Sequence, residues 1–210
     1  GLAEYSTLMF IGEKYGQKDY NDYKAYQLNR WRRYDFPPRS FRDIRYWSPR
    51  RGIVGYVKGM AYYVGLHGLL GDDKFEAFLK ELTSEPFRYA DSGTLWAAAA
   101  KVDDTVSWYN RAMLAGKGFF DLAITDVEKV NEGRYLMKVR SKGFYYWRSE
   151  ISVAGLTKSG KPFAATFRMG KGDTRVEIEL NVEGEISLVT LDPQELIPEL
   201  IRANNSYKVE

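Results

Sequence analysis

The sequence contains no cysteine and only one histidine, His67. The absence of cysteine excludes a disulfide framework and thiol redox chemistry, although it leaves the cellular compartment open. A catalytic zinc ion is held by about three protein ligands, and almost every known set includes histidine or cysteine. The sequence also has no H-E-x-x-H pair, which would place two histidines on one face of a helix. We therefore expect that this chain by itself binds no zinc.

Long apolar runs and a strong charge of either sign are absent as well. No run approaches the roughly 18 apolar residues that a membrane span needs, and the formal net charge is only +3 in 210 residues. The first residues also lack the basic, apolar and small-residue series of a signal peptide. Apolar residues make up 44% of the chain, which is enough to bury a core. We expect a globular protein with no membrane segment in this sequence.

Apolar residues recur every three to four positions in the first half of the chain, which predicts helices. The first helix is predicted over residues 2–15, with Gly16 at its end, and the second over residues 19–34. A third helix is expected to carry Tyr56 and to end at Gly71. Shorter helices follow with short connections between them, which indicates an antiparallel helical array.

In the second half the period becomes alternating, which is typical of strands with one buried face. Residues 176–182 alternate strictly, and Gly184 predicts a hairpin turn from this strand into the next. Another hairpin is predicted at residues 131–133, where a glycine follows Asn and Glu. About seven short strands with regular turn signals favour a small sandwich.

These patterns predict an α+β fold of several regions. Residues 1–116 form the helical array, and residues 117–193 form a small antiparallel β-sandwich. Residues 194–210 are expected to be a C-terminal tail that leaves the sandwich, because Asp-Pro and Asn-Asn pairs are ordinary turn signals.

One motif is more specific than these patterns. The segment Gly55-Tyr56-Val57-Lys58-Gly59 is followed by an aromatic and aliphatic run that ends at Leu70-Gly71-Asp72. It resembles the Tyr-x-Lys-Gly helix start of the aminopeptidase-N-like gluzincins. The opening Gly1-Leu2-Ala3-Glu4-Tyr5 resembles the segment that directly follows the third zinc ligand in this family. The order of helical array and then sandwich is similar to that family as well.

The resemblance implies a carboxy-terminal fragment of a zinc metallopeptidase, with the helical region as part of a thermolysin-like catalytic domain. In the parent protein, zinc and a glutamate base would activate water for attack on the amino-terminal peptide bond of a peptide substrate. Tyr56 is the implied catalytic residue, which supports the charged transition state. The fragment alone should be inactive, because its partner is the missing N-terminal catalytic half. The face formed by Leu2, Tyr5 and Met9 would then be uncovered and could form a homodimer.

Four polar or small residues in these two segments have simpler interpretations than a role in catalysis or metal binding. Lys58 is expected to be a solvated or salt-bridged helix residue, and Gly59 to allow close helix packing. His67 lies in a helix where the family has no ligand, so we expect no metal there. Glu4 is interpreted as a surface residue or as a partner of the helix dipole.

Two other functions compete with the peptidase. Eight arginines lie between Arg30 and Arg51 among aromatic residues, and such a stretch can neutralise phosphates while stacking on bases. Asp35 and Asp43 dilute this charge, and arginines also pair with carboxylates or cover aromatic faces, so nucleic acid is not the expected partner. A protein-interaction module that uses the aromatic residues 144–147 is the other alternative.

Overall fold

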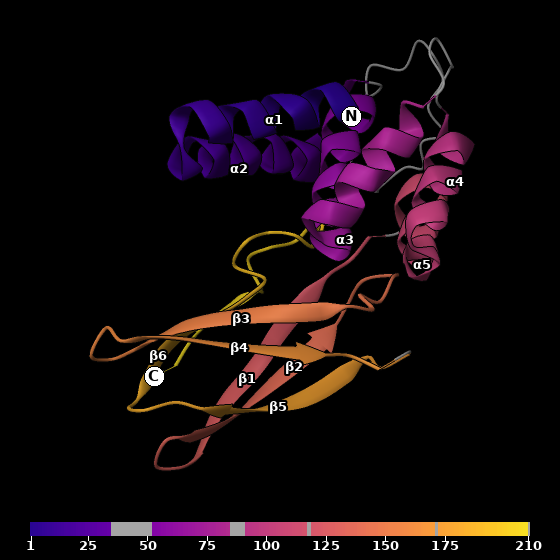
Figure 1. Cartoon of the computed structure of the whole chain (residues 1–210). Helices are drawn as coiled ribbons and strands as arrows, with labels where there is room; N and C mark the ends of the chain where they lie inside the picture. The colour runs from indigo at the N-terminus through magenta and orange to yellow at the C-terminus, as the bar shows by residue number, and fades with distance from the viewer. Residues whose placement is uncertain (35–51, 85–90, 117–118, 171, 210) are drawn as a thin grey trace. The chain divides into compact units, whose positions relative to one another are not determined.

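The computed structural model describes residues 1–34, 52–84, 91–116, 119–170 and 172–209 (Figure 1). Contacts between residues group the chain into two compact units, Gly1–Gly118 and Phe119–Glu210. The first unit is helical, and the second is built from antiparallel strands. The α+β fold class that the sequence predicted is therefore confirmed.

The helical unit opens with two helices that lie side by side (Figure 1). They are α1 (Leu2–Tyr15) and α2 (Gln17–Tyr34), and the chain reverses between them at Gly16, whose φ is 95°. Glycine adopts this left-handed conformation without a steric penalty. The other helices that the described residues form are η2 (Ile53–Lys58), α3 (Gly59–Leu82), α4 (Ser92–Val102), η3 (Asp104–Val106), α5 (Ser107–Asn110) and η4 (Arg111–Ala115).

The long helix α3 is interrupted at Gly71. This residue has φ 73° and ψ 171°, a combination that only glycine adopts readily, so two helical segments meet at a kink. The predicted end of the Tyr56 helix at this position is confirmed. The next helix, α4, begins with a capping box in which the Asp91 carboxylate accepts a hydrogen bond of 2.8 Å from the Thr94 amide.

Aromatic side chains fill the centre of the helical unit. The rings of Tyr62 and Tyr109 stack with centroids 5.7 Å apart, and both side chains are fully buried. Each hydroxyl has a partner, since Tyr62 donates to Oδ1 of Asn110 over 2.9 Å and Tyr109 donates to the Tyr62 carbonyl over 3.0 Å. These bonds satisfy polar groups that would otherwise be costly to bury. Among the helices described, none is long and apolar enough to cross a membrane.

The β unit consists of two antiparallel sheets (Figure 1). Within the described residues, one sheet has the order β1-β2-β5 and the other the order β4-β3-β6-β7. The strands are β1 (Leu122–Asn131), β2 (Arg134–Ser141), β3 (Glu150–Thr157), β4 (Pro162–Arg168), β5 (Arg175–Asn181), β6 (Ile186–Leu191) and β7 (Ser206–Lys208).

Alternate residues of the two sheets are buried and form a sandwich core. In β2 these are Tyr135, Met137 and Val139, each at most 2% exposed. Tyr135 also connects the sheets, because its hydroxyl accepts a hydrogen bond of 3.3 Å from the Ile186 amide of β6. Strand alternation thus predicts which side chains face inward.

Two details of strand pairing differ from the prediction. The hairpin expected at Gly184 is wrong, because β5 pairs with β2 while β6 pairs with β3. The turn therefore passes the chain from one sheet to the other. A turn signal shows where the chain bends but not which strand becomes its neighbour, and this choice depends on long-range packing. Residues 206–208, in the region expected as a tail, form β7 against β6. The predicted hairpin between β1 and β2 is confirmed.

Candidate active site around Tyr56

Tyr56 lies on a turn of π-helix that leads into α3. The wide turn is η2, and it ends where the Gly59 amide donates to the carbonyls of Val54 and Tyr56. Single π-helical turns are rare and occur frequently at functional sites. The π-helical turn is therefore a second feature, besides the sequence motif, that makes Tyr56 a candidate functional residue.

The phenol of Tyr56 is exposed while its neighbours are buried. Its side chain is 59% exposed, whereas Val54 and Val57 are 0% and 2% exposed. The valines anchor the turn in the core and leave the phenol on the surface of the helical unit. Tyr5, Tyr62 and Tyr109 of the same unit lie in its core, where burial raises the pKa of each. Tyr56 is thus placed where a ligand can reach it.

Lys58 is not solvated, which was one of the two environments that we expected. Its side chain is 1% exposed, so the interpretation as a solvated helix residue is wrong. The lysine lies at the end of the π-helical turn, where the chain enters the core. A buried lysine can extend its aliphatic stem along apolar neighbours. The spacing of apolar residues in the sequence does not distinguish such a buried lysine from a solvent-exposed one.

The interpretation of Gly59 as a close-packing residue is confirmed. A Cβ atom built on Gly59 would lie 2.6 Å from Cα of Gly1, so the start of α1 touches the start of α3 through backbone alone. Real Cβ atoms do not come this close to other heavy atoms, and the neighbouring Gly1 atom belongs to the backbone. Gly1, the N-cap of α1, therefore contacts a residue three positions after Tyr56.

Glu4 holds α1 and α2 together. Its Oε1 accepts hydrogen bonds from the hydroxyl of Tyr23 and from Nε2 of Gln27, both on α2. Gln27 is 4% exposed, so the interaction lies at the edge of the core. The carboxylate is therefore a structural acceptor between helices, so the interpretation as a surface residue is wrong, while its position in the first turn of α1 agrees with the alternative of a helix-dipole partner.

His67 is hydrogen-bonded through both ring nitrogens. Its Nδ1 lies 2.6 Å from the Tyr5 hydroxyl, and its Nε2 lies 2.7 Å from Oδ1 of Asp72. The ring also stacks on Phe75 at a centroid distance of 4.4 Å. Tyr5 is 4% exposed, so this residue of the expected Leu2, Tyr5 and Met9 face is in fact part of the core. His67 connects α1 to the kink of α3.

The described residues do not fit a zinc site. No three of their His, Asp and Glu side chains are grouped so that they could hold a metal ion. Oε1 of Glu4 and both ring nitrogens of His67 are used in the hydrogen bonds given above. The described residues alone therefore do not supply the three ligands that a zinc site needs.

Only the beginning of the arginine-rich segment lies within the described residues. Arg30 lies over the Tyr26 ring at 5.7 Å and donates to Oε1 of Gln27 over 2.9 Å, so it covers an aromatic face and has a polar partner. Trp31 is 2% exposed and cannot stack on a base. The arginines from Arg39 to Arg51 lie outside the described residues. The aromatic segment 144–147 connects β2 to β3, with Phe144 76% exposed and Trp147 buried.

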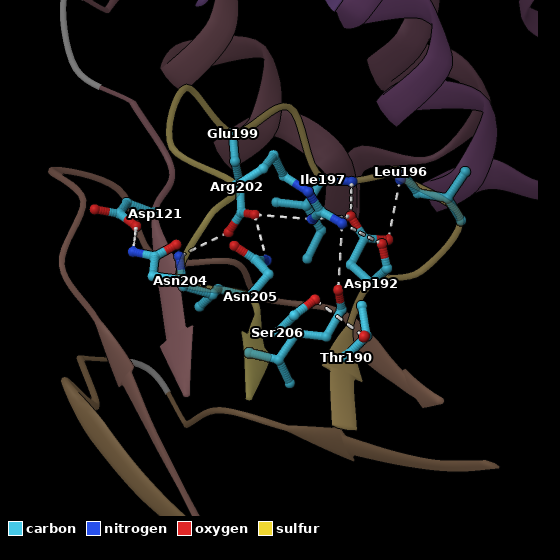
Figure 2. A network of polar contacts seen from close by, with 12 residues as sticks. Asp121, Thr190, Asp192, Leu196, Ile197, Glu199, Arg202, Asn204, Asn205 and Ser206 are labelled. Atoms are coloured by element: carbon cyan, nitrogen blue, oxygen red, sulfur yellow. Dashed lines mark hydrogen bonds and ion pairs between the residues drawn. The ribbon is translucent and has the colours of Figure 1, made fainter. Parts of the chain in front are cut away.

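The β unit contains a buried polar network that the sequence did not predict (Figure 2). Asp192 accepts hydrogen bonds of 3.0 and 2.9 Å from the amides of Leu196 and Ile197. Glu199 accepts one of 2.7 Å from the Leu122 amide and one of 2.6 Å from Nδ2 of Asn205. The only signals in the sequence are the Glu-x-x-Arg spacing of residues 199–202 and the Asp-Pro turn.

Arg202 connects the two buried acids. Its guanidinium lies 3.3 Å from Asp192 and 3.0 Å from Glu199, and it also donates to the Asp192 carbonyl over 2.8 Å. Burial nevertheless raises the pKa of Asp192 to about 6 and that of Glu199 to about 7, because it penalises the charged form of each. The network attaches the segment after β6 to β1 and β6.

Comparisons with known proteins identify a fold but no family. No family model and no curated protein matches the sequence. The structure is similar to that of aminopeptidase A from Legionella pneumophila, solved in complex with aspartic acid, with a TM-score of 0.71 and 16% sequence identity. The similarity covers 95% of this chain but only 23% of that protein. At this identity it shows the fold alone, so the chain has an aminopeptidase-like fold.

Proposed function

We propose that this chain is the carboxy-terminal portion of a zinc-dependent aminopeptidase-type metallopeptidase of the gluzincin kind, which hydrolyses peptide bonds at the amino end of its substrates. The observation that carries the proposal is the exposed Tyr56 on a π-helical turn, within a Tyr-x-Lys-Gly motif. The aminopeptidase-like fold over 95% of the chain supports it.

The proposal divides the active site between this chain and the rest of the parent protein. The chain spans 23% of its structural neighbour, and the described residues hold no zinc site. We therefore assign the zinc ligands and the pocket for the substrate amino group to the missing N-terminal catalytic half. The chain alone is expected to be inactive.

The role proposed for Tyr56 is electrostatic. Its phenol donates a hydrogen bond to the substrate carbonyl oxygen as that oxygen gains negative charge in the transition state. A preorganised donor of this kind contributes about 2.7 to 4 kcal/mol in other enzymes. The donor is useful only where the substrate can reach it, which the exposed position of Tyr56 on the helical unit allows.

The test is a Tyr56→Phe substitution in the intact parent, measured by hydrolysis of amino-acid arylamide substrates. We expect kcat to fall by about two to three orders of magnitude, because only the hydroxyl is removed. Tyr15→Phe is the matched control, since Tyr15 is also 59% exposed but lies at the end of α1. Unchanged kcat in the Tyr56→Phe enzyme refutes the role.

A further inference from the structure

We propose that Gly59 is a positioning residue that sets the distance between Tyr56 and the start of α1. The inference rests on the proposed function, in which the phenol of Tyr56 donates a hydrogen bond in the transition state. It extends that function by naming what fixes the position of the Tyr56 turn: a direct contact between two glycine backbones.

The contact leaves no room for a side chain on either glycine. A Cβ on Gly59 would lie 2.6 Å from Cα and 3.2 Å from N of Gly1. A Cβ on Gly1 would lie 2.7, 2.9 and 3.2 Å from Cα, C and O of Gly59. All of these neighbours are backbone atoms, which cannot rotate away as a flexible side chain could. A methyl group on either residue must therefore push the helix starts apart.

The backbone conformation of Gly59 does not by itself require glycine. Its φ of −62° and ψ of −42° are those of an ordinary α-helix. Alanine at such a position is favoured over glycine by about 1 kcal/mol, because glycine loses more conformational freedom. The close approach of Gly1 is the feature that alanine cannot satisfy.

A displacement of Gly59 is transmitted to Tyr56 through the π-helical turn. The Gly59 amide donates to the carbonyl of Tyr56 and to that of Val54. Val54 and Val57 are buried, so the turn is packed tightly and moves as a unit. A shift of about 1 Å in the position of a catalytic group can cost about 100-fold in rate.

The experiment introduces Gly59→Ala into the intact parent and measures kcat, KM and bound zinc. We expect kcat to fall by about 10- to 100-fold while KM and zinc content stay within about twofold, because the methyl group displaces Tyr56 and leaves the other half intact. Gly52→Ala is the control. Gly52 has nearly the same conformation, with φ −59° and ψ −47°, and no atom of the described residues lies within 4 Å of its added Cβ. Its kcat should be unchanged.

Two further variants distinguish positioning from a general loss of structure. Gly1→Ala inserts a methyl group into the same contact from the α1 side, so it should reproduce the loss of kcat without any substitution in the Tyr56 helix. In a Tyr56→Phe background, Gly59→Ala should cost less than about threefold, since the displaced hydroxyl is already absent.

The outcomes separate the inference from the proposed function. An equal loss in the Tyr56→Phe background, or a loss from Gly52→Ala as large as that from Gly59→Ala, overturns the positioning role. If Gly59→Ala does not fold, Gly1→Ala alone decides the question, and an unchanged kcat overturns the inference. If Tyr56→Phe leaves kcat unchanged, the proposed function of Tyr56 fails, and the inference fails with it.

Discussion

Tyr56 of the helical unit and two acids of the β unit lie in opposite environments. In the helical unit Tyr56 is 59% exposed, while in the β unit Asp192 and Glu199 are 2% and 0% exposed. Buried acids with raised pKa values are often a sign of a catalytic site. In the β unit, however, each of the four carboxylate oxygens accepts a hydrogen bond from an amide, Asn205 or Arg202. We infer that this network stabilises the fold.

The difference shows that exposure of a side chain distinguishes a candidate catalytic group from a structural one better than a raised pKa does. A catalytic side chain must contact a substrate, and only Tyr56 of the groups compared here is open to one. A structural network must instead exclude water, which strengthens its hydrogen bonds and also makes each unpaired group costly. Three measurements test this comparison.

The largest expected effect follows the removal of the buried arginine. Arg202→Met leaves the two carboxylates of Asp192 and Glu199 without their positive partner. Breaking a buried ion pair in this way typically costs about 3–5 kcal/mol. We expect a loss of this size at pH 7 in the stability of the β unit and little change in the helical unit. Hydrogen exchange in a urea series, followed by mass spectrometry, reports each unit separately.

The matched control is the same substitution at an exposed ion pair. Arg134 pairs with Glu179 at 2.7 Å, and their side chains are 45% and 53% exposed. Arg134→Met should cost less than about 1 kcal/mol, because solvent screens such pairs. Equal losses in the two variants would show that the network contributes no more than a surface contact.

The second effect is a dependence of stability on pH that differs between the units. The pKa of Glu199 is raised to about 7 and that of Asp192 to about 6, so the native β unit binds these protons more tightly than the unfolded chain. Their stabilising contribution is complete below about pH 4 and is lost as the pH rises to about 7, on the order of a few kcal/mol. In the helical unit the sign is opposite, because hydrogen bonds from Lys74 and Thr105 lower the pKa of Asp103 to about 2. Its contribution is lost as the pH falls towards 2.

Exchange protection of the Leu122 amide, corrected for the intrinsic pH dependence of exchange, measures the β-unit effect directly. This amide donates to Glu199. Glu199→Gln should reduce overall protection, because its amide faces the donors Arg202 and Asn205, but it should flatten the dependence between about pH 4.5 and 7. A slope as steep as in the original protein argues against Glu199 as its source.

The smallest expected effect concerns self-association. The exposed side of α1 carries Ala3, Ser6, Thr7 and Phe10 on one helix face, and the Lys14 ammonium lies over the Phe10 ring at 5.4 Å. We expect concentration-dependent dimers through this face, observed by size-exclusion chromatography with light scattering. Phe10→Glu should weaken association about 10- to 100-fold, in line with about 1.5–3 kcal/mol for burial of a phenylalanine side chain.

The control for this measurement lies in the β unit. Phe144 is 76% exposed, more than the 53% of Phe10, so Phe144→Glu tests whether any exposed aromatic residue causes association. We expect no change in this variant. A strict monomer at high concentration contradicts the expectation for α1.

The local elements of both units could be predicted because each depends on neighbouring residues. The first helix was predicted over residues 2–15 and is observed as Leu2–Tyr15, since apolar spacing and the glycine at position 16 define it. The kink at Gly71 follows from a backbone conformation that glycine adopts readily. Strict alternation likewise predicted β5 within one residue of its observed start and end.

The candidate site was only partly predictable. The motif around Tyr56 identified the residue but did not reveal the π-helical turn that carries it or the exposure of its phenol. The expected solvation of Lys58 was wrong, because a polar residue in a periodic pattern gives no measure of what packs over it. The buried network of Asp192, Glu199 and Arg202 was not predicted at all. It joins β1 to a much later segment through a hydrogen bond between Leu122 and Glu199, which lie 77 positions apart in the chain.

By itself, the sequence determined the bounds of α1 and, within one residue, of β5, and it indicated Tyr56 as a residue of interest. These properties depend on the backbone preferences and spacing of adjacent residues. Only the tertiary structure decided that β5 pairs with β2, that Gly59 meets Gly1, and that the phenol of Tyr56 is exposed while its neighbours are buried. Each of these is a contact, or the absence of one, between residues far apart in the chain, and it is selected by the packing of the whole unit.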